Sequence, residues 1–422
     1  MSAKLLPQTA KSTFRSKSNM RKRCIRLLLF SVLAVGGFSP PVAGFAGRTA
    51  LTGRRRHFFS PTFISTSCWQ RYRRYHRPSI DIERLWSTST NSESLVESIV
   101  GVVAPLKYMG PYPCLTLAFP NLATPEQRAH NLTGISLDFV LDTGANVNSI
   151  DASVADELGL QISVSSKDLN ILGSAGVGGA FLPGDIFLLG DCQLAGLPQG
   201  QNFTFMTNLT AAALPHPSPV GDGLLSLSFF LSFPAGVEFD WYGTDGDPPT
   251  VIFYYGKELR ENVKAGLTRV PLERLAVQVL SLTVNVNGTD MPALLDTGAP
   301  ITILSHQAAK QAGIETVPLR VEQPFPQRRQ AYGDDALMVR GVDSGHVHLS
   351  RSVSSVPIRA GKVSLGEGPV YVGDLPGLTV MGGLSNSSLP TVILGLDSLR
   401  RTYRMILRVS ENEVWFEELP KR

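Results

Sequence analysis

Apolar and polar residues alternate over short stretches throughout the chain from about residue 100 onward, and few segments repeat with the 3.6-residue period of a helix. Alternation over four to eight residues is typical of half-buried strands. The pattern predicts strands at 113–119, 136–141, 277–286 and 291–295. The last two are joined by Asn287-Gly288, which favours a two-residue hairpin turn. We therefore expect a mostly β protein.

Two short segments, 152–158 and 306–312, depart from this pattern and are predicted to be helices. Asp151 precedes the first and Ser305 the second, and both residue types are good N-caps. A glycine follows each segment, where it can act as a C-cap.

A predicted hairpin follows each of these helices at a distance. Residues 237–241 pair with 251–255 in the first case, and 403–409 pair with 414–417 in the second. The order of strand, helix and hairpin thus occurs twice, which indicates an internal duplication.

The same duplication carries the candidate chemistry. Asp-Thr-Gly occurs at Asp142–Gly144 and again at Asp296–Gly298, an offset of 154 residues. Each copy ends an apolar run and continues with alanine, Ala145 or Ala299. A single Asp-Thr-Gly is weak evidence, whereas two copies in matched surroundings predict two carboxylates facing each other across a pseudo-twofold axis.

With these motifs, residues from about 100 to 420 resemble the aspartic peptidases. In that family each half carries Asp-Thr-Gly and, later, two apolar residues followed by glycine. Asp-Thr-Gly-Ala and Ile393–Leu396 are most similar to the single-chain, two-repeat retropepsin-like branch. The resemblance implies a mostly β, bilobal acid-protease fold with a cleft between its lobes. One departure is Ser226, which stands where the first repeat should have the glycine.

The resemblance implies an aspartic endopeptidase that needs no metal or cofactor. The catalytic pair would be Asp142 and Asp296, supported by Thr143, Gly144, Thr297 and Gly298, with the threonines hydrogen-bonded across the axis. Close carboxylates share one proton, so the ionised one can deprotonate a water while the other stabilises the oxyanion. Ala145 and Ala299 lack the hydroxyl donor of pepsin-like relatives, which predicts activity nearer neutral pH than that of pepsin.

A flap should close over the substrate. The glycine-rich segment 173–179 resembles a retropepsin flap tip, and the alternative of a phosphate cradle lacks the Lys-Ser/Thr that would follow it. In the second repeat both Tyr332-Gly333 and Gly341–Gly345 are candidates. The residues expected to contact substrate are Gly176, Val177 and Gly178 of the flap and Asn146 and Pro300 of the cleft.

Charge separates a leader from the working protein. Residues 1–80 contain 16 of the 39 Lys and Arg residues and none of the 35 Asp and Glu residues. Although the formal net charge of the whole chain is +4, residues 81–422 are acidic. The positive total therefore does not indicate nucleic-acid binding.

Basic residues followed by the apolar run 27–38 and Val42-Ala43-Gly44 are typical of a signal peptide. The expected organisation is a signal peptide at 1–44, a basic transit-like segment at 45–80, a linker or pro-segment at 81–100, and lobes at 101–262 and 266–422. Phe45 at the start of the transit-like segment resembles the two-part leader of complex plastids. Plain secretion is the alternative, and no membrane anchor is expected after the leader is removed.

Cysteines and sequons add little. Beyond the leader only Cys114 and Cys192 remain, too few for a disulfide framework, and they pair once or not at all. Glycosylation sequons begin at Asn131, Asn202, Asn208, Asn287 and Asn386.

Several readings compete with this one. A peptidase fold that binds peptides without cleaving them is the main rival.

His346 and His348 alternate on a predicted strand without an evident third metal ligand. Asp397 is expected to cap or turn the chain, and Arg400-Arg401 to be a solvated surface pair. Because both repeats lie on one chain, a monomer acting on peptide or protein substrates is expected.

Overall fold

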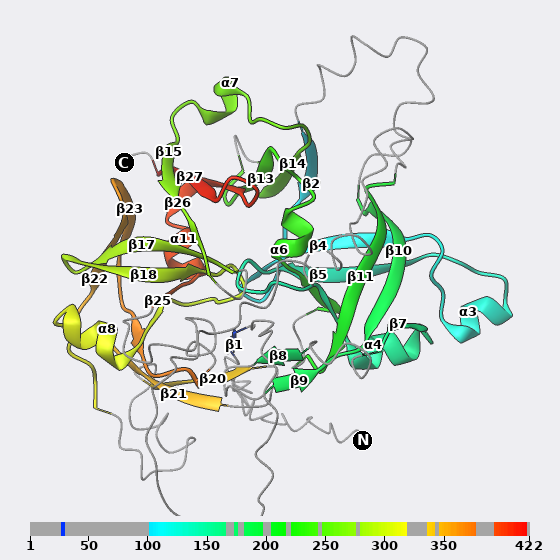
Figure 1. Ribbon diagram of the computed structural model, residues 1–422, viewed down its shortest axis with the longest axis horizontal. Coiled ribbons are helices and arrows are strands. Elements are labelled where there is room, and N and C mark those ends of the chain that lie inside the picture. The colour runs from blue at the N-terminus through cyan, green and yellow to red at the C-terminus, as the bar shows by residue number, and fades with distance from the viewer. Residues whose placement is uncertain are drawn as a thin grey trace, which may run out of the picture.

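The computed structural model describes the two repeats and a small part of the leader. The described residues are 27–29, 101–165, 173–175, 181–196, 204–216, 221–243, 247–275, 279–318, 336–341, 346–376 and 392–419. They form a mostly β, two-lobed protein, as predicted (Figure 1).

The first lobe is built on a sheet of eight strands among the described residues, in the order β3-β4-β5-β12-β6-β11-β10-β7. The strands are β3 (Lys107–Met109), β4 (Tyr112–Phe119), β5 (Ile135–Leu141), β6 (Ser149–Asp151), β7 (Ile162–Val164), β10 (Ile186–Leu194), β11 (Met206–Leu214) and β12 (Gly223–Leu225). The helices are α3 (Pro125–Ala129), α4 (Ala152–Glu157) and α6 (Leu227–Phe230). β12 runs parallel to β5, the strand that ends at the first Asp-Thr-Gly.

The second lobe repeats this arrangement in the order β20-β21-β24-β19-β25-β18-β17-β22-β23, with β16 pairing to β17. The strands are β16 (Glu273–Arg274), β17 (Leu280–Val286), β18 (Thr289–Leu295), β19 (Ile303–Leu304), β20 (Ala336–Gly341), β21 (His346–Arg351), β22 (Val356–Ala360), β23 (Val363–Gly368), β24 (Tyr371–Val372) and β25 (Val392–Leu394). The helices are α8 (His306–Gln311) and α11 (Leu396–Leu399). β25 runs parallel to β18 as β12 does to β5, so each Asp-Thr-Gly loop follows an equivalent pair of strands.

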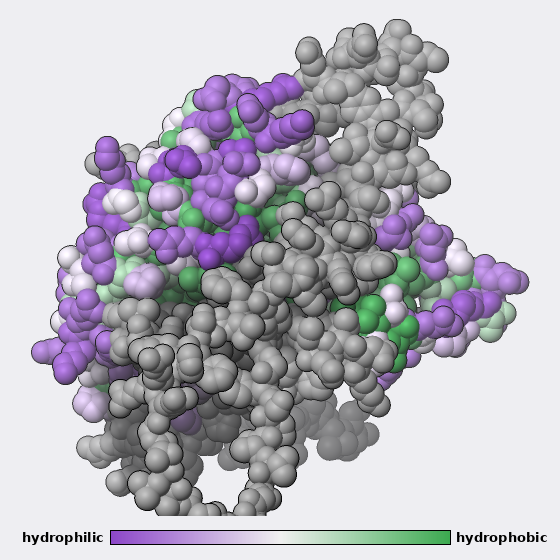
Figure 2. Space-filling view, in the orientation of Figure 1, coloured by the Kyte–Doolittle hydropathy of each residue, from purple (hydrophilic) through white to green (hydrophobic). Residues whose placement is uncertain are grey.

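The two lobes share a third sheet, in the order β15-β27-β26-β13-β14-β2. Its strands are β2 (Val102–Pro105), β13 (Gly236–Asp240), β14 (Thr250–Tyr254), β15 (Thr268–Pro271), β26 (Thr402–Arg408) and β27 (Glu413–Glu418), and helix α7 (Glu261–Lys264) precedes β15. Both predicted hairpins are present, and they meet in antiparallel pairing between β13 and β26. Polar residues dominate the outer surface over this sheet (Figure 2), while its apolar side chains join a core that continues into both lobes.

The predicted strands and helices are confirmed, with small shifts at their ends. Asn287 and Gly288 both have positive φ, 49° and 86°, as the predicted hairpin turn requires. Asp151 caps α4 by accepting from the Ser153 amide, and Ser305 caps α8 by accepting from the Ala308 amide. Helix α3, which was not predicted, has a complete capping box from a Thr-Pro-Glu-Gln sequence that carries the usual signal.

The expectation for the two cysteines is settled. Cys114 and Cys192 are both free and buried, so they do not pair with each other. Within the apolar run of the leader, Leu27–Leu29 form β1, which pairs in parallel with β20. No helix in the described part of the chain is long and apolar enough to cross a membrane.

Candidate active site

The two Asp-Thr-Gly loops meet where the lobes join. Asp142 follows β5 and its amide donates to the Leu225 carbonyl at 2.9 Å, and Asp296 follows β18 and donates to Leu394 at 3.2 Å. The carbonyls of Ala145 and Ala299 accept from the first amides of α6 and α11. Each loop is therefore held between a neighbouring strand and a short helix.

The threonines bind the loops to each other. The Thr143 amide donates to Thr297 Oγ1 at 3.0 Å, and the Thr297 amide donates to Thr143 Oγ1 at 2.9 Å. Each hydroxyl then donates across the axis, Thr143 to the Leu295 carbonyl and Thr297 to the Leu141 carbonyl, at 2.8 and 2.6 Å. All four groups belong to buried residues, so the loops are fixed relative to one another by a closed, symmetric set of hydrogen bonds.

Removing one of these hydroxyls should destabilise the junction. Thr297→Val keeps the shape and strand preference of the side chain but leaves the Thr143 amide and Leu141 carbonyl without that partner. We expect a loss of about 3 kcal/mol in the free energy of unfolding, since a buried polar group left unpaired costs about 1 to 3 kcal/mol. Chemical denaturation should show it, with Thr283→Val on the exposed face of β17 as the control. Equal stability of the two variants would contradict this role for the threonines.

The glycines bring the carboxylates together. The amides of Gly144 and Gly298 donate at 2.8 Å to Oδ1 of Asp142 and Asp296 respectively. A Cβ atom on Gly144 would lie 2.6 Å from Oδ1 of Asp296, and one on Gly298 would lie 2.6 Å from Oδ1 of Asp142. Each carboxylate thus occupies the space beside the glycine of the other lobe, where only a residue without a side chain fits.

Both carboxyl groups are fully buried, and burial dominates their protonation. It raises the pKa of Asp142 to about 6, although the amides of Gly144 and Ala145 favour its charged form. Burial also raises the pKa of Asp296 well above its ordinary value, and the negative charge of Asp142 raises it further. The pair therefore holds a shared proton at pH values where an ordinary aspartate is ionised. The second oxygen of each carboxylate, Oδ2, accepts no hydrogen bond from any described residue.

In the first lobe, Ser226 stands at the position of the expected glycine and is held there by hydrogen bonds. Ser226 is buried and caps α6, accepting from the Ser228 amide at 3.2 Å. Its own amide and hydroxyl both donate to Asn148 Oδ1, at 2.9 and 3.1 Å. Asn148, six residues beyond Asp142, thus accepts two hydrogen bonds from the serine that replaces the expected glycine.

The second lobe uses a different pair at the same positions. Thr302, six residues beyond Asp296, accepts from the Gly395 amide at 3.2 Å and donates to Asp397 at 2.7 Å. Asp397 lies in the first turn of α11, where the sequence placed a cap or turn. The two lobes therefore support their Asp-Thr-Gly loops with non-identical side chains.

The flap predictions are only partly within the described residues. Gly173–Ala175 form β8, which pairs with β9 (Phe181–Pro183) as a two-stranded hairpin. Gly176, Val177 and Gly178 lie between these strands, outside the described residues. In the second lobe, β20 and β21 pair antiparallel. The segment between them, 342–345, belongs to the candidate Gly341–Gly345 and lies outside the described residues, as does Tyr332-Gly333. Both hairpins lie away from the shared sheet in Figure 1.

The remaining predicted residues are placed as follows. Asn146 is half-buried beside the first loop, and Pro300 is half-buried and lines a pocket at the lobe junction. His346 and His348 lie at alternate positions of β21, and the described residues contain no group of three metal-ligating side chains.

Arg400 does not match its prediction. Its guanidinium lies 4.6 Å from the centre of the Tyr108 ring, and the residue is half-buried and lines the same pocket. Its neighbour Arg401 is exposed, as expected. The sequence could not distinguish the two, because the burial of Arg400 depends on β3 of the other lobe.

Residues 282–401 match the model of a family described as gag-polyprotein putative aspartyl protease, and this segment includes Asp296 and α11. No curated protein matches the sequence significantly.

Three solved structures are similar to the chain at low identity. An aspartic proteinase from Irpex lacteus is 13% identical with a TM-score of 0.39, covering 75% of this chain and 97% of its own. The solved structure of edgp is 12% identical with a TM-score of 0.41, covering 76% of this chain and 95% of its own. Basic 7S globulin from soybean is 12% identical with a TM-score of 0.39, covering 76% and 95%.

Proposed function

We propose that this chain is an aspartic peptidase of the retropepsin-like or pepsin-like kind, and that it is an active endopeptidase that uses a water activated by Asp142 and Asp296. The observation that carries the proposal is the closed set of hydrogen bonds between the two loops, which holds two buried carboxyl groups against each other. An intact pair of loops is what the chemistry requires, since both carboxyl groups must act on the same water and carbonyl.

The carboxyl pair would work through a single shared proton. The ionised member accepts a proton from the water, whose oxygen attacks the carbonyl carbon of the scissile peptide. The protonated member donates to the carbonyl oxygen as negative charge develops there. The Oδ2 atoms are suited to these contacts, because Oδ1 of each carboxylate is already bound by the glycine amide of its own loop.

The proposal also covers the substrate, the oligomeric state and the cellular location expected from the sequence. The substrate would be an extended peptide held under the two hairpins β8–β9 and β20–β21. The chain would act as a monomer after removal of its leader, which we propose directs it to a plastid, with secretion as the alternative.

The pH dependence of peptide cleavage tests the proposal. Activity requires one protonated and one ionised carboxyl group, so it must fall once pH rises above the upper pKa of the pair. Burial raises the pKa of both groups, that of Asp142 to about 6. The singly protonated pair is therefore most abundant above about pH 6, and we expect the full-length protein and residues 95–422 to cleave a denatured protein mixture best near neutral pH. Ala145→Ser should move this optimum to lower pH by adding a donor that favours the charged carboxylate.

A statine-type transition-state mimic should also bind and block cleavage. No cleavage by a demonstrably folded sample between pH 3 and 8 would instead favour a peptide-binding protein. An optimum near pH 3 that Ala145→Ser leaves unchanged would contradict the explanation based on burial.

A further inference from the structure

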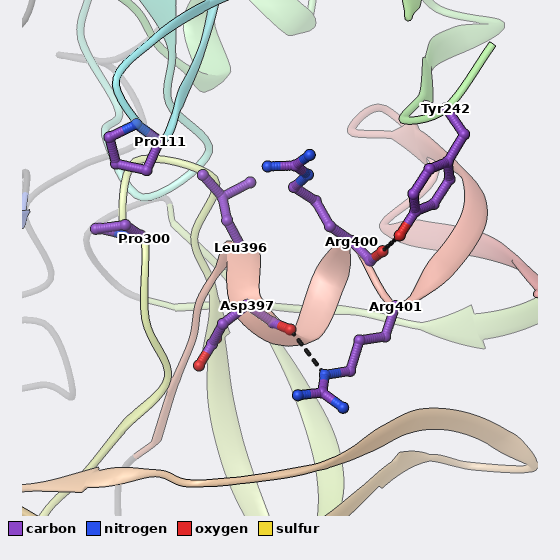
Figure 3. Close-up of a pocket in the computed structure, with 7 residues that line it drawn as sticks. All are labelled: Pro111, Tyr242, Pro300, Leu396, Asp397, Arg400 and Arg401. Atoms are coloured by element: carbon purple, nitrogen blue, oxygen red, sulfur yellow. Dashed lines mark hydrogen bonds between the residues drawn. The ribbon is translucent and has the colours of Figure 1, made fainter. Parts of the chain in front are cut away.

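A pocket with a volume of about 270 Å³ opens at the junction of the two lobes, beside the catalytic loop of the second lobe. It is lined by Pro111 of the first lobe, Tyr242 after β13, Pro300 and four residues at α11: Leu396, Asp397, Arg400 and Arg401 (Figure 3). The peptidase chemistry described above leaves this pocket without a role.

The pocket is lined by Arg400, whose positively charged side chain has an unpaired donor. The Arg400 side chain extends along α11 toward Leu396 and Pro111 in Figure 3, while its main-chain carbonyl accepts from the Tyr242 hydroxyl. Its Nε atom is buried and has no hydrogen-bond partner among the described residues, which also place no carboxylate in an ion pair with it. A buried arginine nitrogen can only donate, so it lacks an acceptor.

Next to it lies a second donor in the same condition. The Tyr108 ring lies under the Arg400 guanidinium, and its hydroxyl is buried without a partner among the described residues. Burial raises the pKa of Tyr108, so the hydroxyl keeps its proton. Two unpaired donors, one of them charged, favour a carboxylate, which offers several acceptor sites.

The other charged groups at the pocket are already engaged. Arg401 donates from Nε to the Asp397 carbonyl at 3.0 Å and from Nη1 to the Glu367 carbonyl at 2.7 Å. The Asp397 carboxylate accepts from Thr302 and points away from Arg400 in Figure 3. Arg400 is therefore the group that can recognise an anion here.

The pocket is within reach of a peptide in the active site. Pro300 is four residues from Asp296, and its carbonyl accepts from the Asp397 amide at 3.2 Å. Four residues span at most about 14 Å, so an extended substrate of similar length can place a side chain in the pocket.

We propose that this pocket selects substrates with an acidic side chain, Asp or Glu, within four residues of the scissile bond, and that Arg400 is the residue that determines this preference. The proposal rests on the endopeptidase function above. The carboxylate accepts from Arg400 while the bond is cleaved elsewhere, so Arg400 takes no part in the chemical step.

Paired fluorogenic peptides test the preference. Each pair differs only by Glu or Gln at one position within four residues of the scissile bond, and kcat/KM is measured for the wild type, Arg400→Gln, Arg400→Lys and Arg359→Gln. Arg359 is an exposed arginine on β22, outside the pocket. We expect the wild type and Arg359→Gln to prefer Glu about tenfold at one position, as a charged hydrogen bond at a half-buried site allows. Arg400→Gln should bring the ratio close to one, and Arg400→Lys should retain part of it.

Two outcomes would overturn the proposal: no preference for Glu at any position in the wild type, or an equal loss with both peptides in Arg400→Gln. Calorimetric binding of the same Glu and Gln peptides to the Asp296→Asn variant separates this proposal from the peptidase proposal. A Glu preference in binding that Arg400→Gln removes would support the pocket even if the wild type cleaves nothing. Equal binding of both peptides would refute it whether or not cleavage occurs.

Discussion

Asp296→Asn should abolish peptide cleavage while leaving the protein at least as stable as the wild type at neutral pH. Without the second carboxyl group the pair can no longer hold one charge and one proton on facing oxygens. Loss of a general acid or base of this kind lowers the rate by about 10² to 10⁴-fold, and loss of the shared proton affects both steps, so we expect at least about 10³-fold. The amide oxygen of asparagine can still accept from Gly298, so the loop should keep its shape.

The gain in stability follows from the raised pKa values. A carboxyl group with a higher pKa in the folded state binds more protons folded than unfolded between the two values. Stability is therefore lost as pH rises from about 4 through the folded pKa. For Asp142, a rise from 3.8 to about 6 corresponds to about 3 kcal/mol lost by neutral pH. Asparagine at position 296 removes the neighbouring charge and recovers part of this energy.

Unfolding free energies at pH 7 and pH 4.5, measured alongside activity, test both parts. Asp156→Asn, on the exposed face of α4, is the control and should change neither quantity. The advantage of Asp296→Asn should shrink at pH 4.5, because the wild-type pair is then largely protonated. Substantial cleavage by Asp296→Asn would rule out the mechanism, and lower stability than the wild type at pH 7 would rule out the account of burial.

Exchanging serine and glycine between the two lobes should have opposite consequences. In the second lobe, a Cβ atom on Gly395 would lie 2.3 Å from the Ile301 carbonyl oxygen and 2.9 Å from that of Ala299. These are main-chain atoms of the second Asp-Thr-Gly loop, so they cannot move without moving Asp296. We expect Gly395→Ser to cost more than about 4 kcal/mol, a large part of the total stability of a typical domain, and to remove the activity.

The reverse change, Ser226→Gly, should be mild. It removes the cap on α6 and one hydrogen bond to Asn148, but the amide of residue 226 still donates to the same oxygen. We expect a cost of about 1 kcal/mol and retained activity. Soluble yield, melting temperature and peptide cleavage of the two variants provide the comparison. If both variants behave alike, the two lobes do not differ in the way described here.

Local patterns were sufficient to predict much of this protein. The Asp-Thr-Gly copies, the caps at Asp151 and Ser305, and the turn at Asn287-Gly288 each depend on a few neighbouring residues, and all appear where expected. The pairing of the two terminal hairpins in one sheet was not predicted, because it depends on contacts between residues more than 150 positions apart.

The candidate site likewise combines features that could be predicted from the sequence with features that depend on residues distant in sequence. The meeting of Asp142 and Asp296 could be expected from the duplication, since a repeated motif implies a twofold arrangement. The partnership of Ser226 with Asn148 could not, because it joins residues 78 positions apart and replaces a different pair in the other lobe. Arg400 was assigned to the surface for the same reason, since Tyr108 reaches it from the opposite lobe.

The central pairing of β13 with β26 also limits how the chain can be divided. Either half alone would end its part of the sheet at an unpaired strand, with a row of main-chain donors and acceptors open to solvent. Such an edge pairs readily with another strand, and in the intact protein each half supplies the strand that covers the edge of the other. The two repeats have therefore become interdependent, and a nick in the connecting segment would leave the halves associated, while synthesis of one half alone would yield a self-associating fragment.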